Sequence, residues 1–385
     1  MKKTLKYIIC ALLCVTALNL TPFIKASAEP FDIESESAIL IDFHSQNVIY
    51  SKNENEHLTI ASMTKIMLLD LCFDALENGE YALTDEICVS ENASGMGGSQ
   101  VFLEGNAKYT AEDLLKSIIV ASANDASVAM AEFLFGSEQE CVYNMNLKAK
   151  EYGMNDTHYS NCTGLPMPEQ YSCAKDVAQV FSKLLSHKEY FKYSGIWMDE
   201  IKHPKGNVTG LTNTNKLIRF YDGCDSGKTG FTKESGFCIA CSAKRGNMRL
   251  VSVVIKAPSS KERFAEVSSM FNYAFANYTN KMVLDKTKPL NIEYKVEGGK
   301  KNSAQIVAAE DYYIFGNKNS KDNVVVDFIP SKGVKAPLKK GDKIGKLVIY
   351  KNGDEIQTVN CLINEDVKEK TYFDCVKDVL RQWAV

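Results

Sequence analysis

The sequence predicts an α+β protein. It would have one antiparallel sheet with helices on both faces and an inserted helical subdomain, then a small all-β domain and a C-terminal amphipathic helix. Three observations predict this. Hairpin patterns of apolar residues occur near both ends of the first 280 residues, at 37–50 and 236–255. Residues 84–190 between them are mainly helical in periodicity. After residue 280, short apolar runs alternate with Lys, Asn and Gly turns, which is typical of a small β domain.

The chain begins with the pattern of a secretory signal peptide. Lysines precede an apolar run at 7–18, and Ala26-Ser27-Ala28 follows as a cleavage site. The run is short for a membrane-spanning helix. We therefore expect residues 1–28 to be removed before Glu29 and the protein to be exported and extracytoplasmic.

Charge and cysteine content exclude several classes of function. Residues 1–28 carry four lysines and no acid, so their removal lowers the formal net charge from −3 to −7. With no basic stripe among aromatic residues, no nucleic-acid partner is expected. The ten cysteines that remain are scattered through apolar runs and are interpreted as small buried hydrophobic residues rather than disulfides. Cys238 and Cys241 point to opposite faces of a predicted strand, so we expect no metal and no cofactor.

The elements follow in order. A hairpin is predicted at 37–43 and 48–50, then a helix from Ser62 to the Gly79 stop signal and a short strand at 86–89. Thr110 begins a capping signal for a helix that is interrupted around 122–125. Further helices are predicted at 126–135, 139–152, 174–186 and 258–278, and strands at the Lys228 stretch, 236–243 and 248–255.

The C-terminal part is divided at two points. We expect a domain of residues 29–280, an all-β domain of residues 281–364 and a helix at 365–385. Apolar residues recur with helical spacing between Asp366 and Val385. This helix is expected either to pack on the β domain or to make peripheral contact with a membrane through residues 366–385.

The chain is organised around Ser62 and Lys65. On a helix, residues three apart share a face, so the Ser62 hydroxyl and the Lys65 amine can meet. Serine attacks a carbonyl only when a base removes its proton, and lysine is such a base only when its pKa is lowered. Ser172 and Lys175 have the same spacing, but Ser172 precedes a helical pattern and is interpreted as a helix N-cap.

Two further motifs follow Ser62 in the chain. Ser122-Ala123-Asn124 interrupts a helix, and Lys228-Thr229-Gly230 leads into the later hairpin. The order of the three motifs is the one found in penicillin-binding proteins and β-lactamases.

Each residue of these motifs has an expected role. Lys65 takes the proton of Ser62, and Ser122 relays a proton to the leaving amine. Asn124 donates to Lys65 or to the substrate. The charge of Lys228 lowers the pKa of Lys65, and Thr229 binds a carboxylate. Gly230 allows substrate to approach the strand, and the N–H groups of Ser62 and Phe231 hold the oxyanion.

The sequence resembles the low-molecular-mass penicillin-binding proteins, the serine-type D-alanyl-D-alanine carboxypeptidases. The stretches that carry the likeness, beyond the three motifs, are 97–103, 121–126 and 228–232. The resemblance implies a β-lactamase/transpeptidase-like fold, removal of the terminal D-Ala from peptidoglycan pentapeptides, and binding of β-lactams to the serine. One departure is Ser226-Gly227 before Lys228, where an apolar residue is expected directly before the lysine. That departure is expected to loosen strand packing.

Four other functions compete with this one. A β-lactamase is disfavoured because no Glu-x-x-Leu-Asn pattern lies between Asn124 and Lys228. A D,D-endopeptidase or transpeptidase acting on cross-linked wall stays open. An inactive wall-binding protein would normally lack Ser62, Lys65 or Lys228. A Ser-His-Asp triad is disfavoured because no Gly-x-Ser-x-Gly occurs in the chain.

Overall fold

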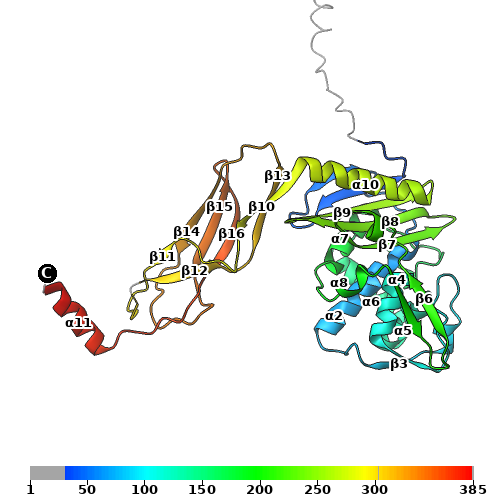
Figure 1. Cartoon of the computed structure of the whole chain (residues 1–385), viewed down its shortest axis with the longest axis horizontal. Coiled ribbons are helices and arrows are strands. Elements are labelled where there is room, and N and C mark those ends of the chain that lie inside the picture. Colours follow the sequence, from blue (N-terminus) through cyan, green and yellow to red (C-terminus); the bar gives the residue numbers. More distant parts are fainter. Residues whose placement is uncertain (1–30, 302, 384–385) are drawn as a thin grey trace, which may run out of the picture. The chain divides into compact units, whose positions relative to one another are not determined.

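The central element is a five-stranded antiparallel sheet in the order β2-β1-β9-β8-β7 (Figure 1). The computed structural model describes residues 31–301 and 303–383, so the predicted signal peptide lies outside the described residues. The sheet joins the two predicted hairpins, because β1 pairs with β9 along its whole length. Its strands are β1 (Ser37–Asp42), β2 (Val48–Lys52), β7 (Cys224–Thr232), β8 (Gly236–Arg245) and β9 (Met248–Ala257).

Helices cover both faces of this sheet. α10 (Ser260–Asn277) packs on β8 and β9, and α7 (Ala174–Leu184) packs on β1 and β9 from the other side (Figure 1). Burial on two faces explains why β1 and most of β9 are buried on both sides of the strand. The predicted α+β fold class is confirmed. The edge strand β7 leaves one side of its backbone unpaired within the sheet, and the site forms along that side.

A helical subdomain is inserted between β2 and β7. Thr110 caps its helix α4 by accepting a hydrogen bond from the Asp113 N–H, as the sequence predicts. The break predicted around 122–125 falls between α4 and α5. The elements are the 3₁₀ turn η1 (Ala61–Thr64), α2 (Lys65–Glu77), β3 (Glu86–Cys88), α3 (Glu91–Ser94), β4 (Lys108–Thr110), α4 (Ala111–Ala121), α5 (Asn124–Phe135), α6 (Glu138–Glu151), α8 (Phe191–Ser194) and α9 (Leu217–Phe220).

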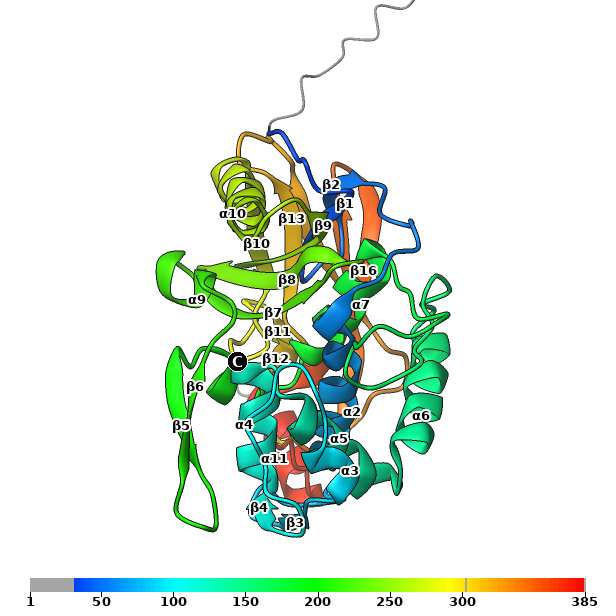
Figure 2. The same cartoon turned by 90° about the vertical axis from the view of Figure 1, so that its right-hand side faces the viewer.

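One hairpin of the subdomain is not predicted by the sequence pattern. It consists of β5 (Met198–Lys202) and β6 (Val208–Thr212) and packs beside α4 (Figure 2). Each strand buries a single side chain, Ile201 or Leu211, so neither shows the alternation of apolar residues that identifies a half-buried strand.

The C-terminal region is all-β and is followed by a helix. β10 pairs with β13, and five further strands form a sheet in the order β11-β12-β16-β15-β14 around a separate core. The domain limits at 280 and 364 stay predictions. No helix in the described part of the chain is long and apolar enough to cross a membrane. The elements are β10 (Tyr278–Leu284), β11 (Glu293–Tyr294), β12 (Ala304–Ala308), β13 (Tyr312–Asn317), β14 (Val324–Pro330), β15 (Lys343–Lys351), β16 (Asp354–Ile363) and α11 (Tyr372–Trp383).

The cysteines lie in the packed interior. Eight of the ten in the described residues are buried, and all ten are free thiols. Burial in apolar surroundings raises the pKa of Cys72 and of Cys162 well above the ordinary value, which makes these thiols poor nucleophiles. Cys238 and Cys241 have different neighbours, since Cys238 donates to the Ser235 carbonyl and the Cys241 sulfur lies 3.4 Å from that of Cys224.

A buried histidine fastens the far end of α2. His187 Nδ1 lies 3.0 Å from Glu77 Oε1, and Nε2 lies 3.4 Å from Asp70 Oδ1 and 3.6 Å from Asp74 Oδ1. Burial lowers the pKa of His187, but the interactions with Asp70 and Glu77 outweigh burial, so the pKa is raised overall.

His187→Gln should therefore destabilise the protein by about 3 kcal/mol at pH 6, because the variant leaves the buried Asp70 carboxylate without a cation. A raised folded-state pKa gives stability that is full below the unfolded pKa and is lost as pH rises through the folded pKa. Urea unfolding at pH 6 and pH 8.5 measures both effects. His158→Gln is the control, since the His158 ring bonds the Glu169 carbonyl rather than carboxylates. An equal difference at both pH values would contradict the ion-pair explanation.

Candidate active site

Ser62 and Lys65 meet where η1 runs into α2. The Lys65 Nζ lies 3.0 Å from Ser62 Oγ and 2.5 Å from the Thr163 carbonyl oxygen. Lys65 is buried, whereas Ser62 is half-buried and faces the open side of β7. The Thr163 carbonyl accepts a hydrogen bond from the amine of Lys65 and so holds this amine beside the Ser62 hydroxyl.

Burial lowers the pKa of Lys65 to about 7, because the ammonium ion loses its hydration. A substantial fraction of Lys65 is thus neutral at neutral pH and can accept the serine proton. The sequence-based expectation that the charge of Lys228 causes this shift is not what the structure shows. For Lys228, burial and then the charges of Lys65 and Arg263 hold the pKa well below its ordinary value.

Ser122 and Lys228 form a second serine–lysine pair. Ser122 follows the last residue of α4 in a left-handed conformation, with φ 61° and ψ 32°. Such a conformation is unfavourable for a residue with a side chain, and here it places the hydroxyl 2.5 Å from Lys228 Nζ on β7. The loop between α4 and α5 and the edge strand are thereby joined across the site.

Asn124 lies beside this pair but does not contact Lys65 through a hydrogen bond in the described structure. Its side-chain N–H₂ donates to the Gly97 carbonyl at 2.7 Å, so the expected donation to Lys65 is not seen. Its Oδ1 is buried and has no hydrogen-bond partner among the described residues. A buried orphan acceptor is costly, and the atom is suited to accept an N–H from a bound substrate.

β7 carries Thr229, Gly230 and Phe231 past the serine. Thr229 is buried, and Phe231 is exposed, with its ring against that of Phe237 at a centroid distance of 4.4 Å. A Cβ on Gly230 would lie 2.7 Å from the Ile60 carbonyl oxygen and 3.1 Å from the Ser62 nitrogen. Glycine at this position therefore allows the serine turn itself, and not only a substrate, to pack against the strand.

Gly230→Ala should lower the rate of acylation by penicillin roughly 100-fold, because either β7 or the serine turn must move. The rate is measured with a fluorescent penicillin under single-turnover conditions. Gly210→Ala on β6 is a matched control, since a Cβ there meets nothing within 4 Å. An acylation rate within twofold of wild type in Gly230→Ala would contradict this packing argument.

The residues before Lys228 pack closely. A Cβ on Gly227 would lie 2.5 Å from the Asn215 side-chain nitrogen and 2.8 Å from the Ala240 carbonyl oxygen. The expectation that Ser226-Gly227 loosens strand packing is therefore wrong, because the glycine makes room for the buried Asn215 side chain.

Several residues that sequence reasoning missed hold the site together. Asn161 Oδ1 accepts from the N–H groups of Thr163 and Gly164, which fixes the carbonyl that binds Lys65. The Asp125 carboxylate accepts from the N–H groups of Val101 and Leu103 and so anchors the loop that follows Gly97 and Gly98. The position of Asp125 directly after Asn124 was a usable signal. Asn161 lies far from every motif and offered none.

Arg263 is a further residue that the motifs do not reveal. It is buried on α10 and donates to the carbonyl oxygens of Gly230 at 3.1 Å and Cys238 at 3.2 Å. A guanidinium that binds both strands from behind keeps β7 in register with β8 next to the serine.

The other serine–lysine spacing does not form a site. Ser172 is buried, its hydroxyl lies 2.8 Å from that of Thr157, and Lys175 is exposed. The helix cap is the neighbouring Cys173, so the assignment of Ser172 as the N-cap is wrong by one residue.

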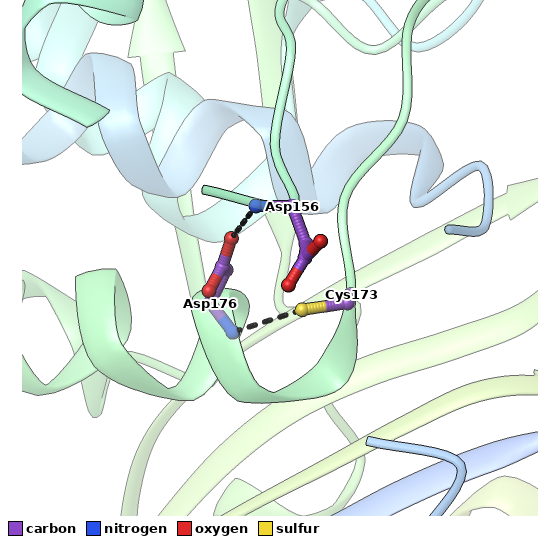
Figure 3. Close-up of side chains that lie close together, drawn as sticks. All are labelled: Asp156, Cys173 and Asp176. Atoms are coloured by element: carbon purple, nitrogen blue, oxygen red, sulfur yellow. Dashed lines mark hydrogen bonds between the residues drawn. The ribbon is translucent and has the colours of Figure 1, made fainter. Parts of the chain in front are cut away.

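The same helix start contains a cluster with ligand atoms suited to a metal, formed by Asp156, Cys173 and Asp176 (Figure 3). Each group already has a structural partner. Asp176 accepts from the Asp156 N–H, Cys173 accepts from the Asp176 N–H, and Asp156 is paired with His57 at 2.8 Å. The cluster is thus explained as the cap of α7.

Comparisons with known proteins agree with this geometry. Residues 24–259 match the family model described as D-alanyl-D-alanine carboxypeptidase, and residues 278–369 match the model of the penicillin-binding protein 5 C-terminal domain. The chain is 39% identical to D-alanyl-D-alanine carboxypeptidase DacF of Bacillus subtilis, with 91% of this chain and 90% of the relative covered. It is 32% identical to DacA of Haemophilus influenzae, with 91% and 90% covered.

A solved structure gives the same result. The crystal structure of penicillin binding protein 5 from Haemophilus influenzae superposes with a TM-score of 0.69 at 30% identity. The superposition covers 88% of this chain and 99% of that one.

Proposed function

Since the chain belongs to the D-alanyl-D-alanine carboxypeptidase family, we propose that it removes the terminal D-Ala from peptidoglycan pentapeptide stems as a serine carboxypeptidase. The observation that carries this proposal is the buried amine of Lys65, 3.0 Å from the Ser62 hydroxyl on the open side of β7. β-Lactams bind the same serine, since they offer an amide carbonyl and a carboxylate to the same groups.

Acylation begins with the neutral form of Lys65. Its nitrogen takes the proton of Ser62 as the oxygen attacks the carbonyl carbon of the penultimate D-Ala. The oxyanion that forms is held by the N–H groups of Ser62 and Phe231, which come from the serine turn and the strand that Gly230 allows to pack together. Each such donor contributes about 3 kcal/mol to the stability of the transition state.

The leaving group is the amine of the terminal D-Ala. Its nitrogen receives the proton of the Ser122 hydroxyl, and Ser122 receives in turn the proton that Lys65 took from Ser62, so Lys65 is neutral again. Lys228, whose Nζ lies 2.5 Å from the Ser122 hydroxyl, keeps its own proton. The carboxylate of the same D-Ala is held by Thr229 and by the positive charge of Lys228. Asn124 Oδ1 accepts the substrate N–H on the acyl side. Water then hydrolyses the ester, with Lys65 as the base, and regenerates Ser62.

The alternatives are a D,D-endopeptidase and, with less support, a β-lactamase. Both use the same serine chemistry, and they differ in what occupies the leaving-group side and in how fast the acyl-enzyme is hydrolysed. The match to a carboxypeptidase extends over 91% of the chain, and this favours a carboxypeptidase over both alternatives.

Product analysis tests the proposal. Purified protein is incubated with pentapeptide monomers and with cross-linked dimers, and the muropeptides are separated by mass. The proposal expects free D-Ala and tetrapeptides from the monomers, and a penicillin acyl-enzyme that persists for many turnovers of peptide. Cleavage of dimers without release of D-Ala from monomers supports the endopeptidase, and rapid turnover of penicillin supports the β-lactamase.

The place of action is outside the cytoplasm, with peripheral contact to the membrane through residues 366–385. The support is the apolar face of α11, where Tyr372 and Phe373 are 79% and 75% exposed and Val376 and Val379 are also exposed. A helix with aromatic and aliphatic residues on one face binds the interface of a bilayer. The triple variant Tyr372→Ser, Phe373→Ser and Val376→Ser should no longer sediment with lipid vesicles, whereas wild type should. Equal sedimentation of the two proteins excludes this contact.

A further inference from the structure

Two cysteine sulfurs are in contact on neighbouring strands, close to the lysine of the edge strand. Cys224 is the first residue of β7 and Cys241 lies within β8, and their Sγ atoms are 3.4 Å apart. Both residues are buried, and both are free thiols in the structure. The Cys238 thiol on the same strand β8 is directed elsewhere, because it donates to the Ser235 carbonyl. The proposed reaction uses none of these sulfurs.

The surroundings direct the two thiols to one point. Both donate to the Ser226 carbonyl oxygen, which lies 3.8 Å from the Cys224 sulfur and 3.5 Å from the Cys241 sulfur. The buried side-chain N–H₂ of Asn215 donates to both sulfurs, at 3.7 Å and 3.5 Å. Because the thiols share a donor and an acceptor, the two side chains are held together between β7 and β8.

A covalent bond between these sulfurs needs only a small movement. The sulfurs of a disulfide are about 2.05 Å apart, so the two must approach by about 1.3 Å. The register of β7 against β8 shifts between Cys224 and Ser226, and a strand bends readily at such an irregularity. After bonding, the Ser226 carbonyl still accepts from the Asn215 N–H₂ at 3.5 Å, so it keeps a hydrogen bond.

The bond would fasten the strand that carries part of the site. β7 is an edge strand, and within the sheet it pairs with β8 alone (Figure 1). Cys241 lies opposite Gly227, which directly precedes Lys228. A covalent link at this point restricts the separation of β7 from β8. It also constrains the unfolded chain between the two cysteines, which is the main way in which a disulfide stabilises a fold.

We propose that Cys224 and Cys241 form a disulfide when the protein meets a thiol-oxidising environment, and that this bond stabilises the edge strand of the site. Outside the cytoplasm, where the protein is proposed to act, disulfides form and persist. The inference goes beyond the proposed function and does not depend on which reaction the site performs.

The oxidant is a small disulfide, and the exchange has two steps. Cys224 reacts first, because it begins β7 and opening of the strand end exposes it. Its thiolate attacks one sulfur of the oxidant, and the other sulfur leaves and takes up the proton that Cys224 lost. Cys241 then loses its proton and attacks the Cys224 sulfur, which expels the second half of the oxidant as a thiol. Two protein thiols are thereby oxidised to one disulfide, and the small disulfide is reduced to two thiols.

The second step depends on pH. Burial, and then the hydrogen bond with Cys224, raise the pKa of the Cys241 thiol well above its ordinary value. The attacking species is the thiolate, so formation of the disulfide should become faster as the pH is raised.

Counting free thiols tests the inference in the mature protein, residues 29–385. The protein is equilibrated either with reduced glutathione or with oxidised glutathione in excess, quenched with acid, unfolded and labelled with a maleimide. Mass spectrometry should find a label on all ten cysteines of the reduced sample and two labels fewer on the oxidised sample. Peptide mapping of the oxidised wild type should find the segments around Cys224 and Cys241 joined, and this result needs no variant.

Three variants provide the controls. Cys224→Ser and Cys241→Ser should each carry the same number of labels in both buffers. Cys238→Ser removes a buried thiol from the same strand and should still lose two labels on oxidation. Oxidation should raise the Tm of wild type by about 5 °C or more and leave that of Cys224→Ser unchanged. Equal numbers of labels on wild type in the two buffers, a joined pair other than these two cysteines, or an unchanged Tm of wild type overturns the inference.

Discussion

Ser62→Ala should abolish both covalent labelling by penicillin and release of D-Ala. Removing the nucleophile of a serine enzyme lowers the rate by about 10⁴-fold or more, because no other group can form the acyl-enzyme. Ser62 is half-buried and accepts a bond only from Lys65 in the hydrogen bonds described, so alanine should keep the fold. Labelling is read on gels with a fluorescent penicillin, and D-Ala release with a coupled oxidase assay.

Ser172→Ala is the matched control, because Ser172 has the same spacing to a lysine. Its hydroxyl bonds Thr157 in the interior and its lysine is exposed, so this variant should lose some stability and keep full labelling. If Ser172→Ala lost labelling and Ser62→Ala kept it, the nucleophile would be assigned to the wrong pair. The two variants together separate loss of the reacting atom from loss of the fold.

The parts of the site that the sequence predicts are those set by local geometry. Ser62 and Lys65 meet because residues three apart share a helix face, and this is independent of the rest of the chain. The kink at Ser122 was likewise visible as an interruption of helical periodicity. The fold class followed for the same reason, since long hairpins and helices carry strong periodic patterns.

The parts that could not be predicted depend on contacts between distant segments. The Thr163 carbonyl that binds Lys65 is a backbone group, and any residue type could supply it. The side-chain N–H₂ of Asn124 donates to the Gly97 carbonyl and not to Lys65, and its Oδ1 has no partner among the described residues, so the expected donation to Lys65 or to a substrate gives way to an available acceptor. Gly227 departs from the pattern of an apolar residue before the lysine because the Asn215 side chain occupies the space that a larger residue would need. In each case the partner, and not the residue itself, determines the role.

Electrostatics shows the same dependence. The sequence identifies the two lysines but does not reveal how deeply each is buried. Burial largely determines how far the pKa of each lysine is shifted. The pKa of Lys65 is lowered by burial alone, whereas the pKa of Lys228 is lowered by burial and by its cationic neighbours. The two lysines are therefore distinguished by their surroundings.

The acylation rate of wild type should rise with pH through about 7 and then level off, because the neutral form of Lys65 is the base and its pKa lies near that value. Lys65→Arg should lower the rate by about 10³-fold or more and remove this rise, since a guanidinium stays protonated throughout. Stopped-flow acylation by a chromogenic penicillin between pH 5.5 and 9 measures both. A wild-type rate that is flat across this range would exclude Lys65 as the group that titrates.

Replacing Lys65 by a residue that cannot be charged should abolish activity but raise the stability of the fold. Because the folded-state pKa of Lys65 is lowered, Lys65 is protonated in the unfolded chain but mostly neutral in the folded chain between about pH 7 and the ordinary lysine pKa. Folding must therefore release a proton in this range, which lowers the stability of the folded state. Lys65→Met fills the same space without an ionisable group, at the loss of the bond to the Thr163 carbonyl. It should therefore be inactive yet more stable than wild type at pH 7, by about 2 kcal/mol. Lys175→Met on the surface should change neither property, so a gain confined to Lys65→Met identifies burial of the base as a destabilising requirement of catalysis.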